Sequence, residues 1–337
     1  INRKVDLSRF TDTTRHLTNS GIPTQGIAFY HQSTLDLLQG LSCSVGLRYD
    51  YEHARCDFSK VQQPLNGNGE TKSLEQFNRS LHFGQFTPRF SMQYLSSHNQ
   101  LFYASVSKGY KAGGFNVSFL NNDDYLYSPE YNWNYEIGTK LSFLNNRLSA
   151  DLSLFYIDWR NQQITNTIPT VGNVIRNAGR SRNKGIEASF QARPTKSWMM
   201  YMNYGYTDAR FVHYQKEERG ILKDYGGNYL PMVPRHTFSL TTGYSFYDIC
   251  SWIDRLTLNA GVSVTGPIYW YEDNQAKQSP YALVNLRISI NKGCFTWEAW
   301  SKNLTNTDYL SYYFVTSKAY AQKGKPITLG TSVSISL

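Results

Sequence analysis

Two stretches decide the fold: HTFSLTTGYSF at 236–246 and RLTLNAGVSVT at 255–265. In each, residues that are mostly apolar alternate with small polar ones, so an extended strand would carry them on opposite faces. Each run is eleven residues long. A tilted strand needs about nine to eleven residues to cross a bilayer, whereas strands in soluble sheets average about five or six. The two stretches therefore predict membrane-crossing β-strands.

The same alternation recurs at 41–51, 148–156, 186–192 and 327–337. The polar face carries Ser, Thr, Gly and Asn rather than Lys and Glu, which suits the wet lumen of a barrel. Aromatic residues gather near strand ends, where the girdles of a membrane barrel belong. Examples are Trp198, Tyr204, Tyr206, Tyr244 and Phe246.

The alternation predicts thirteen strands, and the links between them alternate between short and long. The strands are expected near 25–39, 41–52, 81–95, 100–109, 132–144, 147–159, 183–193, 198–210, 236–247, 255–265, 281–290, 294–303 and 327–337. The long links cover about 53–80, 110–131, 160–182, 211–235, 266–280 and 304–326. Outer-membrane barrels have short periplasmic turns and long extracellular loops, so this rule predicts such a barrel and fixes its orientation.

Composition limits the alternatives. Of 337 residues, 15% are aromatic and 26 are Tyr, yet the mean hydropathy is −0.49. No run of about 18 apolar residues occurs, which excludes a helical membrane span. A soluble all-β sandwich would use the same alternation, but its strands would be shorter and its links would follow no rule. The net charge of +9 is scattered along the chain. It therefore favours the phosphates of lipopolysaccharide or an anionic ligand over nucleic acid.

Nothing in the sequence predicts catalysis, a cofactor or a metal site. The seven histidines are dispersed, and the four cysteines show no metal-ligand spacing. Cys43, Cys56, Cys250 and Cys294 are interpreted as unpaired small residues, and no disulfide between the first two is expected. The chain opens at INRKVDLSRF without a signal peptide, which suggests a mature protein or a fragment.

Thirteen strands are an odd number, whereas bacterial single-chain barrels close with an even number. We interpret residues 1–24 as an extracellular loop segment and 25–337 as the C-terminal strands of the barrel. Because a sheet edge cannot be left open in lipid, further strands upstream of Ile1 are expected.

Five segments, in order, resemble the TonB-dependent outer-membrane receptors. They are PRFSMQYL with NQLFYASVSKGYKAGGFN (88–116), SPEYNWNYEIGTKLSFLNNRLSADLSLFYIDWRNQQ (128–163), NAGRSRNKGIEASFQARP (177–194), PRHTFSLTTGYSF (234–246) and KNLTNTDYL (302–310). Asn177, Gly185 and Glu187 match the family's "N-G-x-x-x-G-E" strand, and 302–310 matches its "NL-x-(D/N)-x-x-Y" motif. One departure is Leu337, where the family usually ends on an aromatic residue, which puts recognition of this end by the assembly machinery in doubt.

The resemblance implies a barrel of twenty-two strands preceded by a plug domain, of which this chain would be the last thirteen strands. It implies active uptake of a scarce large nutrient, energised by the TonB complex acting on the plug. The implied partners are that complex, lipopolysaccharide and outer-membrane lipid, and the nutrient, with a surface lipoprotein as a further candidate. A passive porin or fatty-acid channel of about fourteen strands is the alternative function, and a non-transporting adhesin is a third.

Ligand contacts are expected from three long loops in which aromatic and charged residues mix, because such groups suit a ferric catecholate or hydroxamate. The candidates are His213, Tyr214, Arg219, Lys223, Tyr269, Trp270, Tyr271, Tyr312, Tyr313 and Lys318. Packing of loop on loop is the competing interpretation. A second group lies on the polar strand face and is expected to meet the plug or solvent in an open pore. It consists of Arg48, Arg89, Glu136, Lys140, Glu187, Arg193 and Arg287.

The nature of the ligand is the least determined point. Haem receptors of the family that this chain resembles usually carry a His between the segments matched by GYKAGGF and by Pro129-Glu130. Residues 116–128 contain no His, which disfavours haem as the ligand. Cobalamin and glycans stay open, because Tyr and Trp stack on both. The net charge favours a ferric siderophore, since such chelates are commonly anionic.

Overall fold

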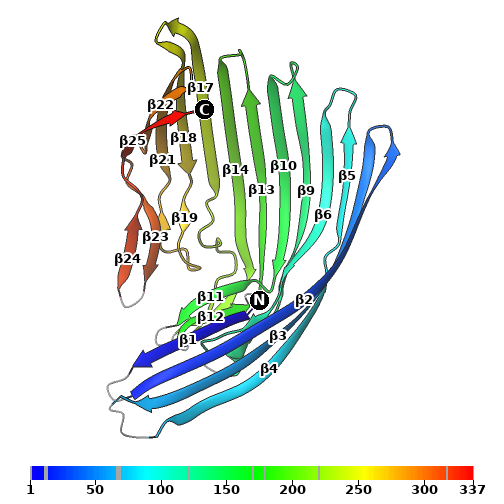
Figure 1. Ribbon diagram of the computed structural model, residues 1–337. Helices are drawn as coiled ribbons and strands as arrows, with labels where there is room; N and C mark the ends of the chain where they lie inside the picture. The colour runs from blue at the N-terminus through cyan, green and yellow to red at the C-terminus, as the bar shows by residue number, and fades with distance from the viewer. Residues whose placement is uncertain are drawn as a thin grey trace.

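The computed structural model describes residues 2–10, 14–65, 70–119, 122–168, 171–177, 179–218, 221–315 and 318–336. They form one curved antiparallel sheet, with its two edge strands far from each other in chain order (Figure 1). Its strands are β1 (Asn2–Phe10), β2 (Thr14–Leu38), β3 (Leu41–Pro64), β4 (Lys72–Phe86), β5 (Arg89–Leu95), β6 (Leu101–Lys111), β9 (Glu130–Phe143), β10 (Leu148–Arg160), β13 (Arg180–Ala192), β14 (Trp198–His213), β17 (His236–Cys250), β18 (Ile253–Thr265), β21 (Tyr281–Lys292), β22 (Phe295–Lys302) and β25 (Thr328–Ile335).

All thirteen predicted strands are confirmed. Only β1 has no counterpart among them, and the expected strand at 81–95 is divided into β4 and β5 at Thr87-Pro88. Proline has no N–H to donate to the ladder, so a break is expected there. Both parts still pair with β3, and β5 also pairs with β6, so the order of the sheet is preserved.

The predicted alternation of links is confirmed except at 53–80, where β3 and β4 take up most of the expected long loop. Short turns join β2 to β3, β5 to β6, β9 to β10, β13 to β14, β17 to β18 and β21 to β22, and they lie together at the top of Figure 1. The long links lie at the opposite end and contain small hairpins of their own. These are β7 (Gly114–Phe115) with β8 (Leu126–Tyr127), β11 (Gln163–Ile168) with β12 (Gly172–Asn177), β15 (Gln215–Glu218) with β16 (Ile221–Asp224), β19 (Ile268–Tyr269) with β20 (Lys277–Gln278), and β23 (Leu310–Val315) with β24 (Ala319–Lys323).

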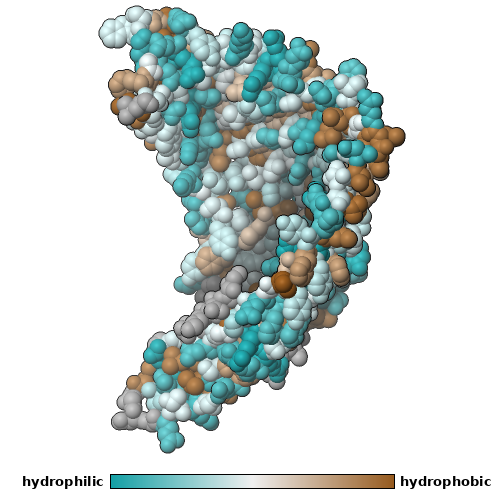
Figure 2. All heavy atoms as spheres, turned by 45° about the vertical axis from the view of Figure 1, so that its right-hand side comes forward, coloured by the Kyte–Doolittle hydropathy of each residue, from teal (hydrophilic) through white to brown (hydrophobic). Residues whose placement is uncertain are grey.

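Cross-strand register keeps the two faces of the sheet distinct. Between β17 and β18, Leu240 lies opposite Val262 and Tyr244 opposite Leu258, while Ser245 lies opposite Thr257. Residues directly opposite each other share a face, so the apolar set faces lipid and the polar set faces the lumen. In Figure 2 hydrophobic residues gather on the right-hand, convex side of the upper half of the molecule.

The strands nearest the N-terminus are longer than predicted. β2 has 25 residues and β3 has 24, so most of 53–80, expected as a loop, continues the strands. Residues 1–24, expected as an extracellular loop segment, contain β1 and the first part of β2, which pair as a hairpin from Asn2↔Pro23 to Phe10↔Arg15. Residues 1–24 and 53–80 lack a clear alternation of apolar and polar residues, because both faces of a strand outside lipid carry polar residues.

A small core lies where this extension meets the body of the sheet. Ala54, Cys56, Phe58 and Phe115 are buried, with Phe77 stacked on Phe58 at 4.8 Å. Burial, and next the charge of Asp57, raises the pKa of the Cys56 thiol to about 11, so this thiol is protonated at neutral pH. All four cysteines are free thiols in the structure.

The described part of the chain contains one short helical turn, η1 (Asn122–Tyr125), and no helix long and apolar enough to span a membrane.

Candidate ligand-binding loops

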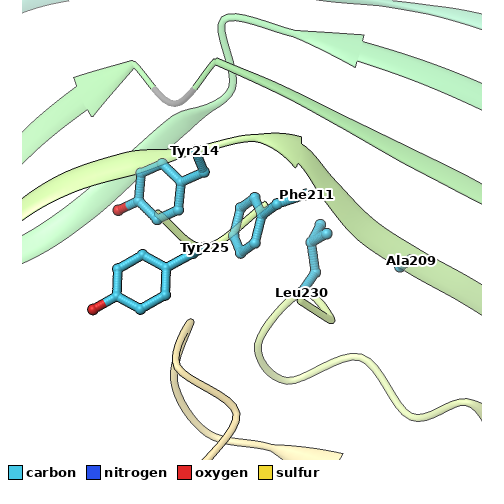
Figure 3. Close-up of a cluster of buried hydrophobic side chains, with 5 residues drawn as sticks. All are labelled: Ala209, Phe211, Tyr214, Tyr225 and Leu230. Atoms are coloured by element: carbon cyan, nitrogen blue, oxygen red, sulfur yellow. The ribbon is translucent and has the colours of Figure 1, made fainter. Parts of the chain in front are cut away.

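The loop at 211–235 folds onto its own apolar cluster. Phe211, Tyr214, Tyr225 and Leu230 pack with Ala209 at the end of β14 (Figure 3). The rings of Phe211 and Tyr214 lie 4.7 Å apart, and Tyr214 is only 5% exposed. The aromatic residues of this loop therefore stabilise its shape.

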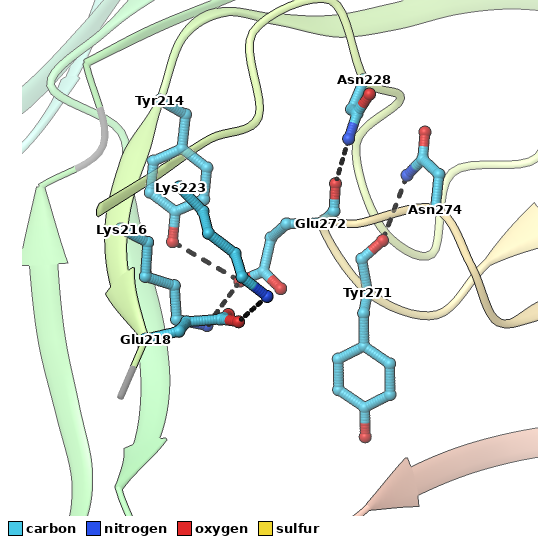
Figure 4. Close-up of polar contacts among 8 residues, drawn as sticks. All are labelled: Tyr214, Lys216, Glu218, Lys223, Asn228, Tyr271, Glu272 and Asn274. Atoms are coloured by element: carbon cyan, nitrogen blue, oxygen red, sulfur yellow. Dashed lines mark hydrogen bonds and ion pairs between the residues drawn. The ribbon is translucent and has the colours of Figure 1, made fainter. Parts of the chain in front are cut away.

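Charged residues of the β15–β16 hairpin pair beside this cluster (Figure 4). Lys223 Nζ lies 3.0 Å from Glu218 Oε2, and Lys216 Nζ lies 3.6 Å from Glu218 Oε1. Desolvation by burial opposes ionisation of Glu218, but hydrogen bonds from Lys223 and Tyr225 and the charges of both lysines lower its pKa overall. Burial and the hydrogen bond to Glu218 raise the pKa of Tyr225. At neutral pH Glu218 is thus an anion held by its neighbours.

Loop 266–280 is fastened to loop 211–235. Asn274 Oδ1 accepts a hydrogen bond from the backbone N–H of Tyr229 at 2.7 Å, and Asn274 Nδ2 donates to the Tyr229 carbonyl at 3.0 Å. Asn228 Nδ2 donates to the Glu272 carbonyl at 2.8 Å. The Glu272 carboxylate lies 3.5 Å from Lys216 Nζ and accepts a 3.5 Å hydrogen bond from the Tyr214 hydroxyl. Backbone and side-chain contacts therefore make the two loops one unit.

The same loop also contacts loop 304–326. The hydroxyl of Tyr271 accepts a 2.6 Å hydrogen bond from the backbone N–H of Val315. Trp270 packs against Tyr312 and Tyr313, with ring centroids 6.4 Å apart in both pairs. The three loops chosen from the sequence are thus brought together, with 266–280 in the middle.

The structure places the ten predicted ligand residues in different surroundings. Tyr214 and Trp270 are buried, so their side chains pack between loops. Tyr269, Tyr271 and Tyr313 are half-buried, while His213, Lys223, Tyr312 and Lys318 are exposed. Arg219 lies outside the described residues.

A cationic and aromatic cluster at the base of the loops was missed by the sequence reasoning. The guanidinium of Arg210 lies 3.9 Å from the ring centroid of Tyr229, and that of Arg235 lies 4.9 Å from it. The ring of Tyr229 stacks on Tyr269 at 5.5 Å with an interplanar angle of 8°. The sequence could have pointed to these two arginines, because Arg210 directly precedes the loop at 211–235 and Arg235 is its last residue.

The charged residues of the polar strand face divide into two groups. Arg48 pairs with Asp50 at 2.6 Å, Arg287 lies 3.9 Å from Glu298, and Glu136 accepts a 2.6 Å hydrogen bond from the Tyr103 hydroxyl. The second group is exposed and forms no ion pair within the described ranges. Its members are Arg89, Lys140, Glu187 and Arg193. No three His, Cys, Asp or Glu side chains of the described chain gather as metal ligands.

One antiparallel sheet with an apolar convex face, membrane-length strands and all long loops at one end defines a transmembrane β-barrel of the outer-membrane class. The chain belongs to the family described as TonB dependent receptor-like, beta-barrel, whose model matches residues 3–306. This membership places its strands in the outer membrane, within a family of receptors and transporters.

Similar proteins agree with this assignment. The pesticin receptor of Yersinia pestis is 24% identical, with 96% of this chain and 46% of the receptor covered. A probable TonB-dependent siderophore receptor, PiuA of Acinetobacter baumannii, is 26% identical over 66% of this chain and 30% of its own length. The chain thus spans about half the length of the pesticin receptor. The solved structure of the ferric yersiniabactin uptake receptor FyuA from Yersinia pestis has a TM-score of 0.78 at 21% identity, covering 99% of this chain and 49% of that one.

Proposed function

We propose that this chain forms the C-terminal part of the barrel of an outer-membrane receptor that takes up an anionic ferric siderophore. Energy would come from the TonB complex acting on a plug domain in the lumen. The observation that carries the proposal is the joining of three long loops into one unit that presents aromatic and cationic groups together. The names of similar proteins support this ligand class. PiuA is named as a siderophore receptor, FyuA as an uptake receptor for ferric yersiniabactin, and the third as a receptor for pesticin.

The chemistry of the loops fits an anionic chelate. Exposed Tyr312 and Lys318 lie on the hairpin of β23 and β24. Exposed His213 lies on the neighbouring loop with Lys223, whose ammonium group is paired with Glu218. Aromatic faces bind catecholate rings by stacking, and cations attract the chelate and raise its local concentration. The Arg210–Tyr229–Arg235 cluster adds two guanidinium groups at the loop base, of which that of Arg210 is paired with Asp208 at 2.8 Å. In this proposal the barrel binds and transports its ligand and catalyses no reaction.

The open sheet supports the expectation of further strands. Among the described residues, the part of β2 beyond its pairing with β1 is paired only with β3, and β25 is paired only with β22. Unpaired backbone groups at an edge are costly in lipid, so strands from elsewhere in the receptor would close the barrel. Lipopolysaccharide and a surface lipoprotein remain proposed partners.

The test is uptake of ferric iron by cells that lack the receptor. We expect loss of growth on one ferric siderophore and restoration by the intact gene. A variant carrying Tyr312→Ala and Lys318→Gln should restore uptake with a Kd raised about tenfold or more, because it loses one stacking and one charge contact. Normal growth on every ferric siderophore, with loss on cobalamin or a glycan, would refute the assignment of the ligand. Ion conductance through the intact receptor in the absence of any plug would favour a porin.

A further inference from the structure

Two histidines form a stacked pair on the long strands β3 and β4. His53 on β3 lies directly opposite His82 on β4, and their ring centroids are 4.6 Å apart with an interplanar angle of 12°. His53 is half-buried and His82 is exposed. Side chains that lie opposite each other on adjacent strands are close enough to bind one ion together, and imidazole is a common metal ligand.

The histidine pair lies on the lipid-facing side of the sheet, but beyond the lipid. The same face of β3 carries Leu47 in the membrane-crossing part, then Tyr49 and Tyr51, and then His53. At about 3.3 Å per residue, His53 lies about 20 Å along the strand from Leu47, past the aromatic residues that mark the edge of the bilayer. β3 and β4 continue side by side towards the lower end of the molecule, where the long links lie (Figure 1). The two imidazoles are therefore open to the medium outside the cell.

A hydrogen bond from a neighbouring side chain prepares His82 as a ligand. The Tyr51 hydroxyl lies 2.9 Å from His82 Nδ1, and the two ring centroids are 6.1 Å apart. When Nδ1–H donates to this hydroxyl, the free lone pair of the ring lies on Nε2. Histidines that bind metals commonly have their other ring nitrogen bonded in this way, because the bond fixes the tautomer and the orientation of the ring.

The surroundings of the pair permit a cation. The next charged residues on this face of β3, Arg55 and Asp57, pair with each other at 3.1 Å, so their charges offset each other. Two nitrogen ligands on one ion lie about 3 Å apart, because each metal–nitrogen distance is about 2.0–2.1 Å. The ring centroids are 4.6 Å apart, so the exposed ring of His82 must tilt towards His53 when an ion binds.

We propose that His53 and His82 bind one divalent late transition metal ion, of the class of Ni²⁺, Cu²⁺ and Zn²⁺, and so clip β3 to β4 outside the membrane. Imidazole nitrogen suits these ions, whereas Mg²⁺ and Ca²⁺ take oxygen ligands. Water completes the coordination, so the ion exchanges with the medium. An ion that binds only while the two strands are paired stabilises that pairing in proportion to its concentration. This site does not depend on which nutrient the receptor takes up.

Binding is measured by calorimetric titration of the full-length receptor in detergent micelles with Ni²⁺. This ion, unlike Cu²⁺, does not oxidise exposed thiols. His53→Gln and His82→Gln should each remove one bound Ni²⁺ per receptor, because neither imidazole alone chelates the ion. Tyr51→Phe should retain this ion with a Kd about tenfold higher, since losing the hydrogen-bond partner of a ligand costs about ten- to a hundredfold in metal affinity.

The control is His236→Gln, which should bind Ni²⁺ like wild type. His236 Nδ1 lies 2.9 Å from the Tyr204 hydroxyl, as His82 Nδ1 does from that of Tyr51, but no second histidine ring among the described residues contacts it. Heat-modifiable electrophoretic mobility shows that each variant has folded. Equal Ni²⁺ stoichiometry and Kd in wild type, His53→Gln and His82→Gln would overturn the metal site.

Hydrogen exchange tests the clip. At a Ni²⁺ concentration about one hundred times the Kd, protection of residues 53–58 and 77–82 should rise about a hundredfold in wild type, because strand opening must first release the ion. His82→Gln should show no such rise, and Mg²⁺ should give none in either protein. Ni²⁺ binding without added protection, or the same protection by Mg²⁺, would overturn the clip between β3 and β4.

Discussion

Trp300 shows how one glycine shapes the lumen wall. It lies opposite Gly330 across β22 and β25, and a Cβ atom at position 330 would come within 2.2 Å of the indole ring. The indole can lie flat on the neighbouring strand only because that position has no side chain. The ring in turn supports the ammonium group of Lys302, whose Nζ lies 5.2 Å from the ring centroid.

We therefore expect Gly330→Ala to destabilise the folded barrel by about 1–3 kcal/mol through overpacking. Urea unfolding of the full receptor in vesicles, followed by Trp fluorescence, measures this change. Gly261→Ala is the matched control, because its Cβ would lie 3.6 Å from Thr241 Oγ1 in ordinary contact. Equal unfolding midpoints for the two variants would contradict the packing argument.

Glu218 predicts a pH dependence for the loop at 211–235. Its pKa in the folded loop is lowered below the ordinary 4.5, so its ion pairs stabilise the loop above that pH and are lost as pH falls through the folded pKa. Hydrogen exchange of residues 211–218 and 221–235 should therefore be constant from neutral pH down to about 5, after correction for the intrinsic rate, and should accelerate below 4.5. Lys223→Gln should raise the pKa of Glu218 towards its ordinary value. If this variant and wild type lose protection at the same pH, the ion pair does not hold the loop.

At the scale of elements, alternation and link length predicted every membrane-crossing strand, because lipid on one face and lumen on the other impose a period of two. That constraint ends with the membrane, so the outer halves of β2, β3 and β4 could not be predicted. The contacts between loops could not be predicted from the sequence either. Trp270 and Tyr214 looked like ligand residues, and only the packing of one loop against another shows that they are buried. Period and composition carry no information on which loops touch.

The joining of loops gives a prediction for Asn274→Ala. This change removes the hydrogen bonds of Asn274 to both backbone groups of Tyr229. Leaving these groups without partners costs about 1–3 kcal/mol, so we expect local opening and hydrogen exchange of Tyr229 and its neighbours to accelerate about tenfold or more. Affinity for the proposed ferric ligand should fall as well. Gln275→Ala is the control, since among the described residues the side chain of Gln275 bonds only to the carbonyl of Asp273 within its own loop. A similar acceleration in this variant would refute the role of Asn274.

At the scale of the whole molecule, the open sheet predicts the behaviour of this segment by itself. Residues 1–337, expressed with a leader sequence, should fail to give a heat-modifiable monomer in the outer membrane, because β25 and the membrane-crossing part of β2, which β1 does not reach, would expose unpaired backbone groups to lipid. The same residues within the full receptor should give one. Fractionation and electrophoresis of boiled and unboiled samples make this comparison. A stable monomer of the segment alone would favour closure as a small channel.

The length of β2 and β3 predicts a part of the protein that antibodies can reach on intact bacteria. A strand of 25 residues is about 80 Å long, and only about ten of those residues are needed to cross the bilayer. The remainder forms a stiff ribbon with β4 that stands clear of the lipid and carries Arg55, Asp57 and Asn78 on the same face as Tyr49 and Tyr51. Antibodies raised against this ribbon should therefore label intact bacteria. Substitution of Arg55 and Asn78 by Ala should weaken that labelling without reducing the proposed uptake of iron, which would make the ribbon an epitope separate from the proposed ligand-binding loops.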